Sequence, residues 1–288
     1  MLSDSRRRTT GLIVGPLALL AACAGGSFPT TAAGQEPAGV VQPTYADLAG
    51  LVEDSAIVAR VQVTDQAAVE PERSPGLATG RVRLYLEATT EALLKAPSPL
   101  GESLKYLVDV PLTPQGKPPK LKKQSYLVFA QPVPGHPGQL QLVKPDAQLP
   151  ADASTDARLR AIIAELAAPD APPPITGVRD AMSVAGNLAG ESETQLFLNT
   201  ADGTPVSLTV VRRPGMAPTW GVSWTEIVDQ AARPPEQGTA AWYRLACFLP
   251  RELPDKAFLQ RDSAPRYQAK ADYALVLDQL GPCTRTLS

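Results

Sequence analysis

Three carboxylates near the middle of the chain would have the most consequential chemistry if they met. Asp180, Glu191 and Glu193 border a run of mostly small residues from 182 to 190. A facing pair of carboxyl groups can cleave a glycosidic bond, one acting as acid and the other as base or nucleophile. Loop carboxylates are common, and the sequence does not show that these three converge. Glycan hydrolysis is therefore kept as an alternative to a non-catalytic role.

Two tryptophans offer a candidate surface for binding. Trp220 and Trp224 lie four residues apart in a predicted strand, so their indoles should point to the same side. Such a pair could stack on a sugar ring or anchor a protein partner. Packing in the core is the other interpretation. We treat the pair as a candidate binding platform.

A basic cluster is the third candidate. It could meet phosphate or an acidic partner, or it could be a solvated loop that protects a sheet edge. The cluster holds four of the nine lysines in the chain: Lys117, Lys120, Lys122 and Lys123.

The remaining composition excludes several classes of function. The one histidine, His136, lies in a Pro/Gly turn, without the fixed orientation that a catalytic base needs. One histidine and three cysteines leave no ligand set for a common zinc site, so we expect no metal. The formal net charge of −2 argues against nucleic acid as the main partner.

The first 23 residues have the pattern of an export signal. Basic Arg6–Arg8 precede an apolar stretch over 11–20, which is too short to span a membrane. Leu20-Ala21-Ala22-Cys23 then resembles the lipobox of bacterial lipoproteins. The resemblance implies cleavage before Cys23, which would carry a diacylglycerol and an N-acyl chain such as palmitate. This covalent lipid is the only cofactor that we expect. A secretory signal with a chance cysteine is the alternative.

The lipobox also implies an address. A lipid-anchored protein of this kind belongs to the periplasm of a Gram-negative bacterium, and Ala24 after the lipidated cysteine favours the outer membrane. In such an oxidising compartment, Cys247 and Cys283 are expected to pair. Their disulfide would close a loop of about 36 residues and stabilise the fold by about 3–4 kcal/mol. A redox pair or two metal ligands are the alternatives, although no Cys-x-x-Cys spacing is present.

The elements that would position these residues fall into two parts. After the signal (1–22) and a flexible tether (23–44), a β-rich part covers 45–149, and a short helix over 46–52 precedes its first strand. Alternation of apolar and polar residues predicts short strands there, separated by Pro/Gly turns, and hence a small barrel or sandwich. The predicted strands cover residues 56–64, 81–89, 104–110, 125–130 and 139–143.

A helix that starts near Ser154 and a Pro-rich linker fill residues 150–174. The second part, 175–288, opens with an ambiguous stretch over 175–190. A three-stranded meander follows, with Ala201-Asp202-Gly203 as a hairpin turn. Helices are predicted over 240–248 and 267–280. The fold class is therefore mainly β, or α+β.

Residues 54–143 resemble the OB barrels of netrin-like and metalloproteinase-inhibitor-like domains. The resemblance rests on the segments at 54–61, 91–95 and 123–129, and it implies a barrel fold. It implies no inhibitory activity, because the disulfides of those families are missing and Cys23 lies far upstream of the first strand.

As a whole, the chain resembles two-part periplasmic lipoproteins of Gram-negative bacteria. We therefore expect a non-enzymatic binding or scaffolding protein, held to the membrane by lipid. Its partner would be an envelope protein or a glycan, and not nucleic acid. A structural spacer without a ligand is the third possibility.

Overall fold

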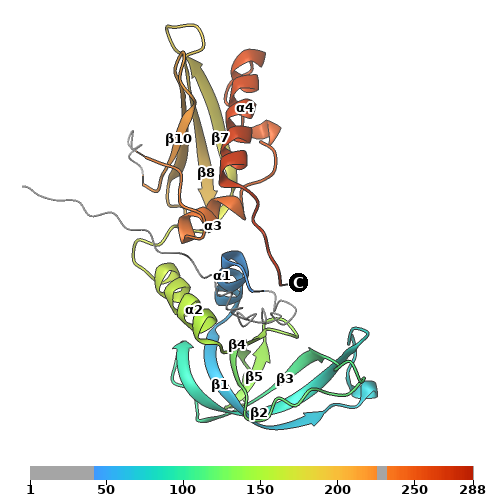
Figure 1. The fold of residues 1–288 in the computed structure, drawn as a ribbon. Coiled ribbons are helices and arrows are strands. Elements are labelled where there is room, and N and C mark those ends of the chain that lie inside the picture. The colour runs from blue at the N-terminus through green and yellow to red at the C-terminus, as the bar shows by residue number, and fades with distance from the viewer. Residues whose placement is uncertain (1–41, 226–231, 288) are drawn as a thin grey trace, which may run out of the picture. The chain divides into compact units, whose positions relative to one another are not determined.

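The amino-terminal strands close into a barrel. The structure, a computed structural model, describes residues 42–225 and 232–287 (Figure 1). Six strands form the first sheet in the order β1-β2-β3-β5-β4-β6, and β1 also pairs with β4 along Ile57–Gln62. That extra pairing closes β1 to β5 into a five-stranded barrel. The strands are β1 (Ile57–Ala68), β2 (Arg81–Lys95), β3 (Ser103–Pro111), β4 (Ser125–Pro132), β5 (Gln139–Leu142) and β6 (Gln148–Pro150).

The strand order confirms the predicted OB-like barrel. β3 and β5 run parallel, whereas the other neighbours in this sheet are antiparallel. The alternation in the sequence explains the barrel interior, because Leu84 and Leu86 of β2 are fully buried between outward-facing residues. Leu86 lies opposite Tyr106 of β3, which is also buried. Burial of each such side chain stabilises the fold by about 1.5–3 kcal/mol.

Helix α1 (Tyr45–Asp54) is held at both ends by side chains. Thr44 and Asp47 form a capping box at its start. At its end, the Lys95 ammonium of β2 donates to the carbonyls of Val52 and Ser55, each at 2.6 Å. A lysine at this position satisfies carbonyls that have no partner within the helix and complements the negative end of the helix dipole. These hydrogen bonds attach the end of α1 to strand β2 of the barrel.

Helix α2 (Ala153–Leu166) begins two residues earlier than the sequence indicated. Its cap is Asp152 and not Ser154, because Asp152 Oδ1 accepts from the backbone N–H groups of Ser154 (3.0 Å) and Thr155 (2.9 Å). These residues lie within the predicted linker region of 150–174, and the division of the chain into two modules there stays a prediction.

Replacement of Asp152 with alanine should destabilise the protein by about 1 kcal/mol at neutral pH. Hydrogen bonds from Ser154 and Thr155 lower the pKa of Asp152 to about 2, from an ordinary value of 3.8. A pKa that is lowered by folding stabilises the fold above the unfolded value, and this contribution is lost as the pH falls through the folded value. Urea unfolding should therefore show a gap between wild type and D152A that narrows between about pH 4 and pH 2. Asp170→Ala, beyond the end of α2, is the control; an equal effect from it would contradict this cap.

The second sheet has four strands rather than the three that the meander pattern predicted. Its order is β10-β9-β8-β7, with antiparallel neighbours. The strands are β7 (Ile175–Ala185), β8 (Ser192–Thr200), β9 (Val206–Arg212) and β10 (Thr219–Ser223). Two register shifts in β7, near Gly177 and Asp180, interrupt its period of two and explain why this stretch was ambiguous in the sequence.

Helix α4 (Ser263–Leu280) packs against β7 and β8 of this sheet, as Figure 1 shows. Between the sheet and α4 the chain forms helix α3 (Ala240–Ala246) and a short 3-10 helix, η2 (Asp255–Ala257). A second 3-10 helix, η1 (Pro71–Arg73), follows β1. Helix α4 begins at Ser263, four residues before the predicted start at 267. The sequence prediction followed the apolar residues of one helix face, and these residues do not extend into the first turn. Within residues 42–225 and 232–287, no helix combines the length and apolar character of a membrane span.

Candidate ligand-binding cleft

The outward face of strands β2 and β3 forms the floor of a cleft. The alternation that buries Leu84 and Leu86 turns Arg83, Tyr85 and Glu87 outward. The register of the sheet sets each of them opposite an outward residue of β3. The three cross-strand pairs are Arg83 with Asp109, Tyr85 with Leu107, and Glu87 with Lys105.

The two outer pairs are ion pairs. Arg83 binds Asp109 with two parallel bonds, Nε to Oδ1 at 2.7 Å and Nη2 to Oδ2 at 2.8 Å. Lys105 Nζ lies 2.9 Å from Glu87 Oε1. The bonds to Asp109 raise the pKa of Arg83, and the bond to Glu87 raises the pKa of Lys105. Both basic groups are therefore held in their charged form, and the two parallel bonds to Asp109 fix the position of Arg83.

The central pair is apolar and exposed. Tyr85 is 37% exposed and Leu107 is 47% exposed, although each lies between ion pairs on the surface of a barrel. Large apolar side chains in a concave, partly charged surface are typical of ligand sites. The phenol ring and the leucine side chain provide an apolar surface with polar groups on both sides.

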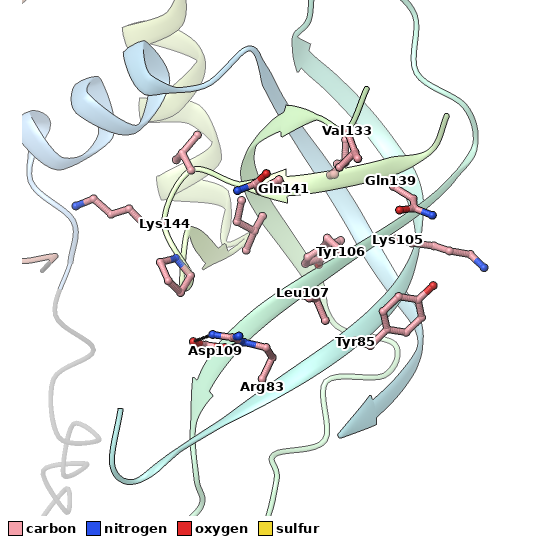
Figure 2. Close-up of a pocket in the computed structure, with 14 residues that line it drawn as sticks. Arg83, Tyr85, Lys105, Tyr106, Leu107, Asp109, Val133, Gln139, Gln141 and Lys144 are labelled. Atoms are coloured by element: carbon pink, nitrogen blue, oxygen red, sulfur yellow. Dashed lines mark hydrogen bonds and ion pairs between the residues drawn. The ribbon is translucent and has the colours of Figure 1, made fainter. Parts of the chain in front are cut away.

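Strand β5 and the chain that follows it form the wall of the cleft. Figure 2 shows Gln139 and Gln141 of β5, with Lys144 beyond them, around the floor formed by β2 and β3. The cleft is open to solvent and has a volume of about 520 Å³, within the range of small-molecule sites. The hydrogen bond from Asp109 N to Pro145 O, at 2.7 Å, attaches this wall to β3.

The floor and the wall of the cleft present polar and charged groups around an apolar centre. Beneath its floor, burial raises the pKa of Tyr106, whose hydroxyl donates to Gln148 Oε1 at 2.7 Å. The described residues that line the cleft include no serine, threonine, cysteine or histidine. The chain provides amide, ammonium and guanidinium donors together with carboxylate and amide acceptors around an apolar centre.

The structure does not bring the three candidate carboxylates together. Asp180 Oδ2 pairs with Arg179 at 2.7 Å, while Glu193 lies opposite Val184, four residues further along β7. Four residues of a strand span about 13 Å. Glu191 closes the turn between β7 and β8, where its Oε2 accepts from the backbone N–H of Leu188 at 3.2 Å. Only Glu191 and Glu193 line the same hollow, of about 440 Å³.

The candidate tryptophan platform is corrected by the positions of its two residues. Trp220 is only 4% exposed, and its indole N–H donates to Gln279 Oε1 of α4 at 2.8 Å. Trp224 lies beyond the end of β10 and packs, partly buried, against the core. The two indoles therefore belong to the packing of the second part of the fold, because Trp220 is buried and bonded to α4 and Trp224 packs partly buried against the core.

The basic cluster and His136 lie on the surface. The four lysines of the cluster are exposed, and Lys122 Nζ lies 3.2 Å from Asp65 Oδ1. Gln66 holds their loop to the barrel, with its Oε1 accepting from Leu121 N at 2.6 Å. His136 is exposed in its turn, with Nδ1 3.0 Å from Pro134 O. Neither feature contributes to the cleft, and the described residues contain no cluster of three or more potential metal ligands.

The predicted disulfide is confirmed, whereas the predicted signal and lipidation site cannot be compared with the structure. The sulfur atoms of Cys247 and Cys283 lie 2.08 Å apart, a disulfide-bond length. The signal over 1–22, the lipobox with Cys23 and nearly all of the tether lie outside the described residues.

The cleft was not predicted from the sequence, although the alternation places Tyr85 on the polar side of its strand. An aromatic residue at that position was the available signal.

Comparison of the chain with models of known protein families found no match, and comparison with curated protein sequences found none either. The candidate function therefore rests on the geometry of the cleft.

Proposed function

We propose that this chain is a lipid-anchored binding protein of the Gram-negative periplasm, held at the outer membrane, and that the barrel cleft captures an envelope glycan. The observation that carries the proposal is the exposed pair of Tyr85 and Leu107 between two ion pairs. The lipobox at Cys23 supports the address. In this proposal, the lipid holds the protein at the membrane while the barrel binds its ligand without chemical change.

The chemistry of the cleft favours a glycan over other envelope ligands. A pyranose ring has an apolar face of C–H groups, which can lie on Tyr85 and Leu107, and a rim of hydroxyl groups. Gln139 and Gln141 supply both donors and acceptors for such hydroxyl groups. The volume of about 520 Å³ gives room for more than one sugar unit.

Glycan titration tests this function. The Cys23→Ser chain, which cannot receive the lipid, is titrated with soluble fragments of cell-wall glycan and with lipopolysaccharide-core oligosaccharide in a calorimeter. We expect saturable binding to at least one of these fragments. An absence of saturable binding to all of them would overturn the proposed ligand class.

The proposed anchor makes a separate prediction. In a Gram-negative host, the wild-type chain should sediment with the membranes. Cys23→Ser, exported behind a cleavable secretory signal in place of residues 1–22, should move to the soluble periplasmic fraction, because it has neither acyl chains nor an uncleaved apolar segment. Cell fractionation followed by immunoblotting measures the distribution, with Cys247→Ser as the control that should stay with the membranes. A membrane-bound Cys23→Ser chain would contradict the anchor.

Glycan hydrolysis through the carboxylates is the second candidate function. One observation favours it, since Glu191 and Glu193 line the same hollow in the second sheet. Release of new reducing ends from cell-wall glycan, abolished by Glu193→Gln, would support this activity. Unchanged glycan after prolonged incubation would exclude it for that substrate.

A further inference from the structure

The last residues of the chain form a strap, residues 283–287, that connects the disulfide to helix α1. Thr286 donates to Asp47 Oδ2 from its backbone N–H (2.9 Å) and from its hydroxyl (2.8 Å). The backbone N–H of Leu287 donates to Asp47 Oδ1 at 3.2 Å. Arg285 Nη1 donates to the carbonyl of Ala46 at 2.7 Å. Segments 239 residues apart in the sequence are thus joined by four hydrogen bonds.

Asp47 anchors both the strap and the start of helix α1. Its Oδ2 also accepts from the backbone N–H of Thr44 at 2.8 Å, as part of the capping box. Burial alone would raise the pKa of Asp47, but the hydrogen bonds from Thr286 and Thr44 outweigh burial and lower the pKa below its ordinary value. The carboxylate is therefore charged at neutral pH, and its bonds to the strap are lost only as the pH falls below the ordinary value of 3.8.

The other end of the strap is fixed by the Cys247–Cys283 disulfide. Cys247 lies at the end of α3 and Cys283 lies three residues after the end of α4, so the bond fixes the start of the strap to the second part of the fold. The backbone N–H of Gly281 caps α4 by bonding Leu277 O at 3.1 Å, and the strap begins directly beyond this cap.

The disulfide is accessible to an attacking thiol. Cys247 and Cys283 both line an open hollow of about 610 Å³, together with Arg251 and Arg285. Nearby guanidinium groups stabilise a thiolate, which is both the attacking species and the leaving group in thiol–disulfide exchange. Asp278 lines the same hollow, so its charge is mixed, and the open lining is what gives a thiol access to the sulfur atoms.

We propose that the Cys247–Cys283 disulfide is a redox-sensitive switch. Its reduction weakens the contacts between the strap and helix α1. A thiolate of an external dithiol attacks one sulfur and forms a mixed disulfide, while the other cysteine leaves as a thiolate and takes up a proton. The second thiol of the reductant then displaces the first cysteine, so that the reductant becomes a disulfide and both cysteines become thiols. Two electrons pass from the dithiol to the protein. The strap then loses its covalent link to α3 and is held by its hydrogen bonds to Asp47 and Ala46, by the packing of Leu287 and by its continuity with α4, so its contacts with α1 open more often.

Hydrogen exchange on the full mature chain tests the switch, with dithiothreitol as the dithiol. Reduction should accelerate exchange of the Thr286 and Leu287 amides about tenfold or more, because local opening replaces a fixed contact. The amides of Val128 and Phe129 in the barrel should keep their protection. Unchanged exchange at Thr286 and Leu287 after reduction, or a bond that is reduced only when the barrel unfolds, would overturn the proposal.

The variant Asp47→Ala distinguishes the contribution of the hydrogen bonds to Asp47 from the contribution of the disulfide. In this variant the Thr286 and Leu287 amides should exchange fast already in the oxidised protein, and reduction should add little further acceleration. The matched control is Asp152→Ala, which removes the capping carboxylate of α2 and should leave the strap protected until the disulfide is reduced. If reduction accelerated exchange by the same factor in Asp47→Ala as in wild type, the disulfide would act without the strap and the proposal would fail.

Discussion

Arg212→Leu should destabilise the protein by about 3–5 kcal/mol, the largest effect that we expect from a single surface-accessible side chain. Asp272 of helix α4 is fully buried, and its Oδ1 lies 2.6 Å from Arg212 Nε of β9. The Thr194 hydroxyl donates to Asp272 Oδ2, and Gln268 Nε2 donates to Oδ1 at 3.0 Å. Without Arg212, the carboxylate stays buried with hydrogen bonds but no counter-charge. Thermal unfolding should show a melting temperature lower by roughly 10 °C.

A surface ion pair provides the matched control for Arg212→Leu. Arg160 and Asp156 of α2 are four residues apart and 2.7 Å from each other, with the arginine side chain 51% exposed. Arg160→Leu should change stability by no more than about 0.5 kcal/mol. The double variant Arg212→Leu/Asp272→Leu should recover much of the loss, since it leaves no buried charge. Equal effects from Arg212→Leu and Arg160→Leu would contradict the role of this pair.

Tyr85→Ala should weaken glycan binding by about tenfold or more, which corresponds to about 1.4 kcal/mol of binding free energy. The ring forms half of the apolar pair in the floor of the cleft, opposite Leu107. Its removal deletes the surface on which a sugar ring would lie and leaves the flanking ion pairs in place. Because Tyr85 is 37% exposed, the free energy of unfolding should change little in comparison. Calorimetric titration measures the affinity, and thermal unfolding measures the stability.

Tyr267→Ala is the matched control for the cleft. Tyr267 is another exposed tyrosine, 77% accessible on helix α4, and it is not among the residues that line the cleft. Its removal should leave glycan affinity within about twofold of wild type, because it changes no group near the ligand. If Tyr267→Ala weakened binding as much as Tyr85→Ala, binding would not depend on the cleft.

The barrel could be predicted because each of its strands carries its own pattern. Alternation in β2 and β3 follows from one face packing inward at Leu84 and Tyr106 while the other meets solvent. Strand β7 was ambiguous because its bulges bring apolar Ile175, Val178 and Ala181 inward at a spacing of three. A pattern of period two reveals a regular strand, but it does not reveal a strand whose register shifts at a bulge.

The candidate sites were harder to predict, because they depend on which elements pack together. The indole of Trp220 could be assigned to a face of its strand, but only the folded structure, in which it bonds Gln279 of α4, shows that the indole is buried. The cleft joins Tyr85 to Leu107 and Gln141 through sheet register and barrel closure, which the spacing along the chain does not contain. The disulfide was predictable for a different reason, since two remaining cysteines in an oxidising compartment have few other partners.

The central claim is that the face of β2 and β3 captures a glycan. The most direct test is a residue-resolved NMR titration of the Cys23→Ser chain with the glycan fragment that binds most tightly. We predict chemical-shift changes that concentrate on Tyr85, Lys105, Leu107, Gln139 and Gln141, with the second sheet unaffected. Saturable changes that map instead to the hollow at Glu191 and Glu193, or to no contiguous surface, would contradict the assignment of the cleft.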